Sequence, residues 1–203
     1  MNLKKPDEKI LVVARHLLLG HTAPQGLIIT NLEGYQKSIQ ESKEFLWRSE
    51  METNPAYKQI IPYLIFTYDD KYFLMKRKSK PGDLRLASNY SLGIGGHIRE
   101  EDLQSSKLNG IEQWAEREFI EEIEYQDNLT IEPIGILNDE SNEVGRVHTG
   151  FVFLMRGDSD KISIRDEHEW GRLVTLEELS TYFHQMESWS QIVFNHLKIT
   201  LKQ

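Results

Sequence analysis

Three glutamates in a helical pattern are the residues of this chain best suited to chemistry. Glu118, Glu121 and Glu122 stand at positions i, i+3 and i+4 of IEQWAEREFIEEIEY, so a helix carries their carboxylates on one face. Like charges at this spacing destabilise a bare helix, and a hard divalent cation offsets their repulsion. Mg²⁺ prefers carboxylate oxygens and completes its shell with water and substrate phosphates. The pattern favours a metal site, and its alternative is a solvated acidic surface.

The elements around these glutamates have to place them against a sheet. We expect a helix over roughly residues 110–124, whose opposite face is apolar at helical spacing and suited to packing on strands. That face consists of Ile111, Trp114, Ala115, Phe119 and Ile123. The helix is preceded by Gly93, Gly95 and Gly96, which allow the backbone to bend tightly or to approach a ligand closely.

The rest of the chain alternates strand-like and helix-like segments. Strands are predicted at 10–19, 129–139 and 148–157, and a hairpin is predicted from 60–68 and 71–78 around Asp69-Asp70. A helix is predicted at 35–50, and two more follow capping-box patterns that start at Thr175 and Ser188. This order predicts an α+β or mixed α/β layered domain. We expect an N-terminal extension at 1–57 and the main domain at 58–203.

The bulk composition excludes several classes of protein. The chain has 203 residues, a formal net charge of -8 and no cysteine, which rules out disulfides, thiolate metal sites and cysteine nucleophiles. An acidic protein is a poor candidate for binding a nucleic-acid polymer or a membrane surface, because both partners are polyanionic. The N-terminus lacks the apolar core of a signal peptide, and the longest apolar runs are too short to span a bilayer. These features indicate a cytoplasmic protein.

The segment from Gly96 to Tyr125 resembles the Nudix hydrolases. Their box is G-x5-E-x7-R-E-U-x-E-E-x-G-U, where U is a bulky apolar residue. Gly96 matches the first glycine, residues 117–122 (REFIEE) match R-E-U-x-E-E in full, and Tyr125 takes the last apolar position. Over residues ~58–200 the chain is similar to a bacterial branch of predicted phosphoesterases.

The resemblance implies a fold, a cofactor and a reaction. The fold is a Nudix-type α/β/α sandwich with a mixed sheet, here with an N-terminal α/β extension that either packs on the domain or makes a contact in a homodimer. Mg²⁺ or Mn²⁺ is held by Glu118, Glu121 and Glu122, with Gly96 as a further metal-site residue. Water attacks a diphosphate linkage in a small nucleoside diphosphate derivative, with Glu121 and Glu122 acting at the metal and Arg117 orienting a carboxylate.

Three departures from the box affect its loop and the end of its helix. Gly96 and Arg117 are twenty-one positions apart instead of fourteen, so seven residues are inserted. Asn109 stands where the first box glutamate belongs, which leaves Glu100, Glu101 or Glu112 as a partner for Arg117. Glu124 replaces the late glycine, a residue that normally serves the C-terminal turn of the helix.

Other polar residues are weaker candidates. The acidic loop 138–145 offers Asp139, Glu140 and Glu143 as a general base or an extra metal ligand, and we take Glu143 as a catalytic candidate. Ordinary structural or surface positions are favoured for His97, His148, Glu167 and Glu169. A solvated loop and a phosphate contact explain equally well the basic run of Lys76, Arg77, Lys78 and Lys80.

Two rival functions share the predicted fold. Isopentenyl diphosphate isomerase chemistry relies on an active-site cysteine, which this chain lacks. A catalytically silent, nucleotide-binding sensor is favoured by Asn109 and the insertion, and the intact REFIEE segment counts against it.

Overall fold

The computed structural model describes residues 7–78, 90–101, 111–166 and 168–200, and the chain divides into two compact units. Unit 1 comprises Met1–Pro62, Gly96–Trp114 and Gly135–Phe151, and unit 2 comprises Tyr63–Gly95, Ala115–Ile134 and Val152–Gln203. Three strands, β4 (Tyr57–Tyr68), β9 (Leu129–Asn138) and β10 (His148–Gly157), contribute residues to both units, as does helix α5 (Ile111–Glu122). Among the described residues, no helix is long and apolar enough to cross a membrane.

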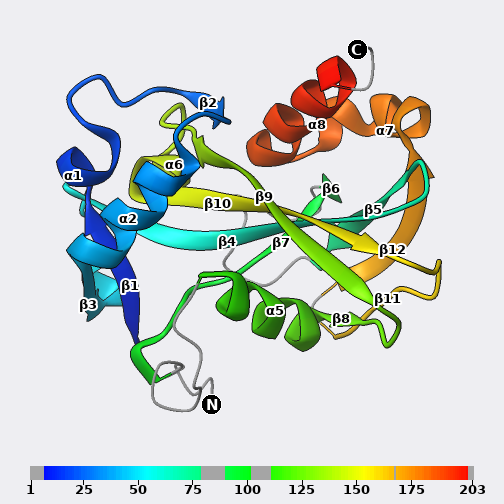
Figure 1. Cartoon of the computed structure of the whole chain (residues 1–203), viewed down its shortest axis with the longest axis horizontal. Helices are drawn as coiled ribbons and strands as arrows, with labels where there is room; N and C mark the ends of the chain where they lie inside the picture. The colour runs from blue at the N-terminus through cyan, green and yellow to red at the C-terminus, as the bar shows by residue number, and fades with distance from the viewer. Residues whose placement is uncertain (1–6, 79–89, 102–110, 167, 201–203) are drawn as a thin grey trace. The chain divides into compact units, whose positions relative to one another are not determined.

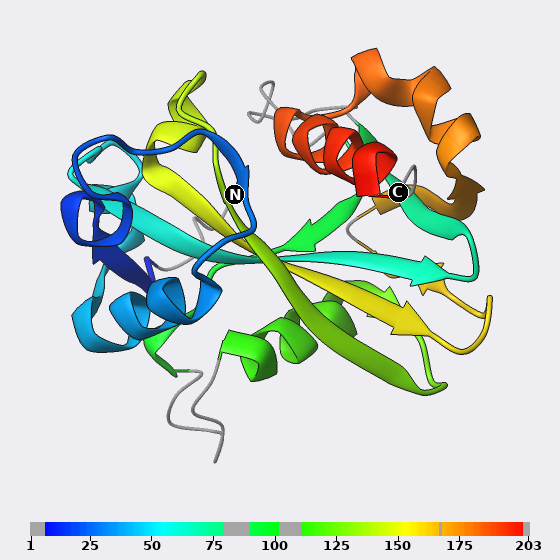
Figure 2. The ribbon, with the colours of Figure 1, turned by 45° about the horizontal axis from the view of Figure 1, so that its top comes forward.

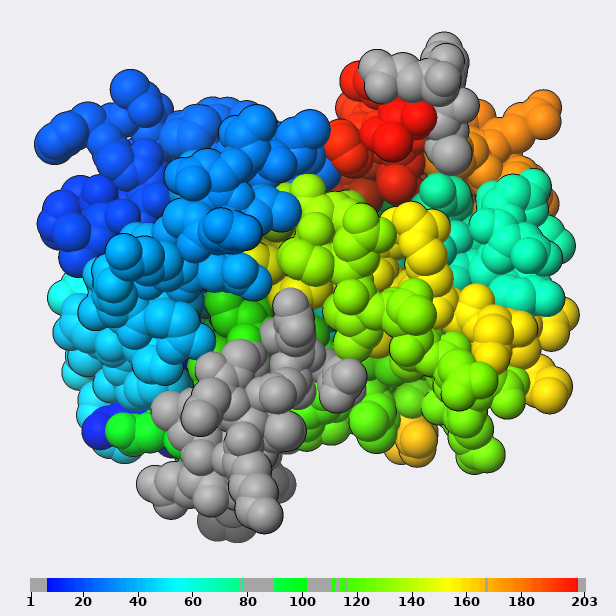
Figure 3. Space-filling model, viewed as in Figure 1, coloured from blue at the N-terminus to red at the C-terminus, as the bar shows by residue number. Residues whose placement is uncertain are grey.

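Unit 1 is built around β1 (Lys9–Ala14), which lies antiparallel to both β3 (Lys43–Trp47) and β4. The side chains of Ile10, Val12 and Met51 are buried there. Helices α1 (Arg15–Leu19) and α2 (Leu32–Ser42) lie side by side (Figure 1), and their side chains form a continuous blue surface in the space-filling view (Figure 3). The unit also holds β2 (Gly26–Ile28), α3 (Arg48–Met51) and α6 (Glu143–Val147).

Two predicted elements of this region are wrong in part. The strand expected over 10–19 ends at Ala14, and the chain turns into α1 at Arg15, whose guanidinium is bound by Glu140. The helix expected over 35–50 is interrupted because Lys43–Trp47 pairs with β1 as a strand, with Glu44 opposite Val12. In both places long-range contacts override the local pattern. The N-terminal segment is nevertheless of the expected α/β type.

Unit 2 has the layers of the predicted sandwich. Its strands follow the order β12 (His168–Thr175), β5 (Lys71–Arg77), β4, β10 and β9. Helix α5 lies on one side of these strands, and α7 (Leu176–Tyr182) and α8 (Ser188–Thr200) lie on the other (Figures 1 and 2). The turn η1 (Phe183–Gln185) joins α7 to α8. The predicted fold class, mixed α/β with a mixed sheet, is confirmed.

Several local predictions for this unit are also confirmed. The hairpin of β4 and β5 turns at Asp69, whose φ of 52° is in the left-handed region. Thr175 and Glu178 form the reciprocal capping box that starts α7. The predicted apolar residues of α5 are buried, and the Phe119 ring stacks on Phe66 with centroids 6.0 Å apart.

Short strands fix both ends of the box region. β6 (Tyr90–Ser91) pairs with β5, and β7 (Gly93–Gly95) pairs with β4. Gly93 and Gly95 therefore lie in a strand and do not form a tight bend, while the close approach to a ligand stays a prediction. Gly93 is required there because a Cβ atom would overlap the Tyr63 ring. After α5, β8 (Ile123–Glu124) pairs with β11 (Ser163–Ile164).

Candidate active site

The arginine of the box holds two of the three candidate metal ligands on its own helix. Arg117 Nη1 donates to Glu121 Oε1 at 2.7 Å, and Nη2 donates to Glu118 Oε2 at 3.1 Å. Arg117 is half-buried and Glu118 is mostly buried, whereas about half of the Glu121 side chain is exposed. Two carboxylates therefore turn toward one positive charge at the solvent-facing side of α5.

The third carboxylate of the box lies in a buried polar position. Glu122 is the last residue of α5, and its Oε2 lies 3.7 Å from Nε2 of His168, with both side chains buried. Its backbone oxygen accepts a hydrogen bond from the Arg165 amide at 2.9 Å. The sequence did not single out His168, although its neighbours Glu167 and Glu169 were candidates. Glu167 lies outside the described residues, and Glu169 pairs with Lys76 at 2.9 Å.

A bulge in β12 and the short strand β8 lie next to the contact between His168 and Glu122 in unit 2. The register of β12 against β5 shifts between His168 and Trp170, and such shifts re-aim a side chain. The pairing of Glu124 with Ser163 extends the chain directly from α5 into β8. Glu124 thus replaces the box glycine without a left-handed turn, because the helix ends in a strand.

The remaining box positions lie elsewhere. Gly96 follows β7 and belongs to unit 1, and Asn109 lies outside the described residues. Of the carboxylates considered as partners for Arg117, Glu100 pairs with Lys9 at 3.4 Å and Glu101 pairs with Arg99 at 3.5 Å. The side chain of Glu112 is also outside the described part of the structure.

The acidic loop after β9 commits two of its three candidate carboxylates to structure. Asp139 is buried and accepts hydrogen bonds from the Ser141 amide and the Asn142 side chain. Glu140 binds Arg15 through both oxygens at 2.8 Å. Glu143 stands exposed in the first turn of α6. Of these three carboxylates, Glu143 is the most exposed to solvent.

A fully buried lysine anchors this loop. Lys58 Nζ donates to the Gly145 carbonyl at 2.8 Å and pairs with Glu140 Oε1 at 3.0 Å. Hydrogen bonds from Arg15 and Lys58 lower the pKa of Glu140 to about 2. Burial lowers the pKa of Lys58, and Glu140 opposes that shift. The Arg15–Glu140–Lys58 network joins residues that are far apart in the sequence, so no local motif predicts it.

Two histidines from the sequence analysis meet in unit 1. His97 Nε2 lies 2.7 Å from Gln59 Oε1 and 3.4 Å from His148 Nε2. His148 Nδ1 donates to the Val144 carbonyl at 2.7 Å. Burial lowers the pKa of both histidines, that of His97 well below its usual range, so both are neutral at pH 7.

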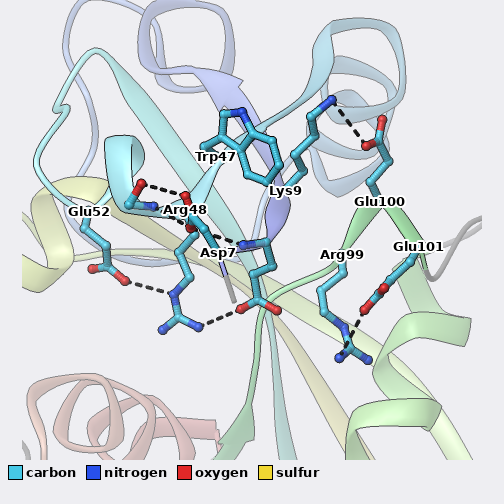
Figure 4. Close-up of a pocket in the computed structure, with 10 residues that line it drawn as sticks. Asp7, Lys9, Trp47, Arg48, Glu52, Arg99, Glu100 and Glu101 are labelled. Atoms are coloured by element: carbon cyan, nitrogen blue, oxygen red, sulfur yellow. Dashed lines mark hydrogen bonds and ion pairs between the residues drawn. The ribbon is translucent and has the colours of Figure 1, made fainter. Parts of the chain in front are cut away.

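A wide depression of about 1120 Å³ lies in unit 1 (Figure 4). Its lining residues come from the segments 7–9, 47–52 and 99–101. Its cations are already paired: Arg48 with Glu8 and Glu52, Lys9 with Glu100, and Arg99 with Glu101. Carboxylates outnumber cations among its lining residues, which disfavours an anionic ligand such as a diphosphate.

The basic run begins at the end of β5, and two of its lysines contact residues of unit 2 that are distant in the sequence. Lys76 is paired with Glu169, and Lys78 donates to the Asp166 carbonyl at 2.6 Å. The side chain of Arg77 and the whole of Lys80 lie outside the described residues. No phosphate-binding role for this run follows from these contacts.

The donor set of α5 suits a hard cation. In the described part of the chain, no group of three His, Cys, Asp or Glu side chains converges as a metal site. Glu118 and Glu121 nevertheless offer oxygen atoms to a single guanidinium, and oxygen donors of this kind are the ligands of Mg²⁺ and Mn²⁺. The residues present therefore fit a divalent cation chemically, with Glu122 set apart beside His168.

The comparison with solved structures identifies the family. No protein-family model matches the chain. The crystal structure of Tm1382, a protein assigned to the Nudix hydrolases, is 33% identical, has a TM-score of 0.78 and covers 94% of this chain and 98% of its own. The chain belongs to the Nudix hydrolase family, whose members are pyrophosphohydrolases.

Two more distant solved structures agree in fold, and a bacterial protein is similar in sequence. The NUDIX domain of NrtR from Shewanella oneidensis, solved with ADP ribose, is 13% identical with a TM-score of 0.55 over 71% of this chain and 88% of its own. The MutT protein from Methanosarcina mazei Go1 is 15% identical with a TM-score of 0.52 over 72% of this chain and 96% of its own. Protein YmaB of Bacillus subtilis strain 168 is 29% identical over 158 residues, which are 74% of this chain and 76% of that protein.

Proposed function

We propose that this protein is a Mg²⁺- or Mn²⁺-dependent hydrolase that cleaves a diphosphate linkage in a small nucleoside diphosphate derivative. Its membership of the Nudix hydrolases supports the reaction class. The observation that carries the metal assignment is the turning of Glu118 and Glu121 toward one cationic group on α5. The ADP ribose bound by the NUDIX domain of NrtR makes ADP-ribose a reasonable first compound to test.

In this proposal the glutamates of the box bind the metal ion and the arginine orients them. Glu118 and Glu121 would hold the divalent cation, and Glu122, which lies beside His168, would turn toward it as the third ligand. The cation, when bound, would neutralise diphosphate charge and acidify water. Arg117 keeps Glu118 and Glu121 oriented, because its two nitrogen atoms bind one oxygen of each. Gly96 as a metal-site residue and Glu143 as a general base remain predictions.

The substrate is expected to be a small molecule and not a nucleic-acid polymer. The net charge of -8 opposes binding of long polyanions, whereas a bound cation can hold a single diphosphate group. The acidic, cysteine-free composition further supports our proposal that the enzyme works in the cytoplasm. We also propose that residues 1–57 form an extension of the domain at 58–203. This extension either packs on the domain or makes a homodimer contact.

The test is turnover of a panel of diphosphate compounds, including ADP-ribose and a dinucleoside polyphosphate, with Mg²⁺ or Mn²⁺. The informative variants are Glu121→Gln and Glu118→Gln, which keep side-chain size and remove one ligand charge. Glu124→Gln is the matched control, because Glu124 is an exposed carboxylate just beyond α5 in β8.

We expect metal-dependent turnover that falls at least about a hundredfold in Glu121→Gln and stays unchanged in Glu124→Gln. Unchanged turnover in both box variants would remove these residues from the proposed site. If no compound is hydrolysed, yet Mg²⁺ together with a nucleotide raises the melting temperature, the catalytically silent sensor replaces the hydrolase as the preferred function.

A further inference from the structure

The cluster of His97, Gln59 and His148 brings three potential ligand atoms together within unit 1. His97 follows Gly96 in the chain, Gln59 lies on β4, and His148 is the first residue of β10. Gln59 is fully buried, His148 is 8% exposed and His97 is partly exposed. The cluster is therefore held by strands and retains access to solvent through His97.

The surrounding hydrogen bonds fix which atoms face the centre of the cluster. The Val144 carbonyl can only accept, so His148 Nδ1 carries the proton and the lone pair of Nε2 points toward His97. The Gln59 amide nitrogen donates to the Met51 carbonyl at 3.2 Å, which directs Oε1 toward His97. One His97 Nε2 proton thus faces two acceptors, Gln59 Oε1 and His148 Nε2.

The spacing of the two imidazole nitrogens matches coordination to one metal ion. Two nitrogen atoms bound to a tetrahedral Zn²⁺ at about 2.05 Å lie about 3.4 Å apart. His97 Nε2 and His148 Nε2 are 3.4 Å apart. A histidine ligand commonly donates its other ring nitrogen to a backbone carbonyl, as His148 does to Val144. A metal ion that replaces the shared proton meets these two nitrogen donors. Gln59 Oε1 lies 2.7 Å from His97 Nε2 and would move outward to become the oxygen donor.

The donor chemistry and the local charges define the kind of ion. Imidazole nitrogen suits Zn²⁺, Cu²⁺ and Ni²⁺, whereas Mg²⁺ prefers the carboxylate oxygens of α5. Charged groups act on both histidines: Arg48 on His97, and Arg48, Lys58 and the carboxylate of Glu52 on His148.

We infer that His97, His148 and Gln59 form a binding site for a divalent transition-metal ion of the Zn²⁺ class, with water completing its coordination. Because one ligand is an amide oxygen, the site has two strong donors and its affinity is moderate. The bound ion would link the segment after Gly96 to the beginnings of β4 and β10. This inference does not rest on the hydrolase activity proposed for α5.

The test is Zn²⁺ binding to the untagged, full-length protein after chelator treatment, measured by isothermal titration calorimetry. The variants are His97→Asn and His148→Asn. The control variants are His184→Asn, which alters an exposed histidine, and Glu121→Gln, which alters the carboxylate site on α5. Circular dichroism without metal establishes whether each variant is folded.

We expect one Zn²⁺ equivalent in the wild type, with affinity at least about tenfold lower in each of the two test variants, since losing even an outer partner of a ligand costs about that much. His184→Asn and Glu121→Gln should retain this site. Zn²⁺ at about 100 times its Kd should raise the melting temperature of the wild type by roughly 5–10 °C.

Unchanged Zn²⁺ affinity in folded His97→Asn and His148→Asn would overturn the inference, as would its loss in Glu121→Gln alone. If either test variant fails to fold, electron paramagnetic resonance of one Cu²⁺ equivalent on the wild type decides. Superhyperfine splitting from two imidazole nitrogens supports the site, and its absence overturns it. Mg²⁺-dependent turnover, measured separately, can fail without affecting either outcome.

Discussion

Replacement of Glu140 by glutamine should destabilise the protein, because it removes the anionic partner of the buried Lys58. Glu140→Gln keeps the size of the side chain and removes the negative charge that lies 3.0 Å from Lys58 Nζ. Lys58 is fully buried, and its hydrogen bonds to the Gly145 and His148 carbonyls supply no negative charge. The substitution also removes the charge of the two-oxygen contact with Arg15.

The magnitude follows from the burial of the three charged groups. Removing one partner of a buried ion pair costs about 3–5 kcal/mol, whereas an exposed pair contributes about 0–1 kcal/mol. Lys58 is completely buried, while 21% of the Glu140 side chain and 31% of the Arg15 side chain are exposed. We therefore expect a loss of about 2–3 kcal/mol in the free energy of unfolding at pH 7, intermediate between these limits.

The difference between wild type and variant should depend on pH. The pKa of Glu140 is lowered in the folded protein, from 4.5 to about 2, so its stabilising contribution is present above pH 4.5 and is lost as pH falls toward 2. Urea unfolding followed by circular dichroism at pH 7, 5 and 3.5 measures this contribution. The gap between the two proteins should be largest at pH 7 and should narrow by pH 3.5.

Two further variants test the explanation. Glu44→Gln, an exposed carboxylate on β3, should change stability by less than about 0.5 kcal/mol. Lys58→Met combined with Glu140→Gln should recover part of the loss, because the unpaired buried charge is gone. A Glu140→Gln protein as stable as wild type, or a gap that is the same at every pH, would refute the proposed role of this network.

Three other substitutions probe local packing and helix capping. Gly145→Ala should cost at least about 2 kcal/mol in urea unfolding, because the new methyl group overlaps the Asp139 backbone oxygen, and an unaltered midpoint would contradict this. Thr175→Ala should cost about 1 kcal/mol while Thr175→Ser costs less, since serine keeps the cap to Glu178; equal losses would argue against the cap. Phe119→Ala should cost about 3–5 kcal/mol in the same assay, and a loss under about 1 kcal/mol would show that this face of α5 is poorly packed.

Strong periodicity made the centre of the chain predictable. The apolar spacing from Ile111 to Ile123 predicts helix α5 and its buried face, and Asp69-Asp70 predicts the hairpin turn. The N-terminal region was harder, because Lys43–Trp47 becomes a strand through pairing with β1. A local pattern that suits a helix does not reveal such a partner.

The limits of prediction at the candidate site have the same cause. The spacing of Glu118 and Glu121 beside Arg117 points to the carboxylate pair on α5, which the structure brings onto one guanidinium. Sequence spacing says nothing of the different surroundings of Glu122, because these come from His168, forty-six positions later in the chain (168 − 122). A bulge in β12, which has no clear sequence signature, aims that histidine.

The end of α5 shows how a box without its late glycine can still hold its carboxylates. A glycine there supplies a left-handed turn that satisfies the last carbonyls of the helix. Here the Arg165 amide binds the Glu122 carbonyl, and the Arg165 guanidinium binds the Ile123 carbonyl at 3.0 Å. Pairing of Glu124 with Ser163 continues the same connection. β11 precedes β12 in the chain. The pairing of β8 with β11 therefore fixes both the end of α5 and the start of the segment that carries His168. The box glycine is dispensable for this reason.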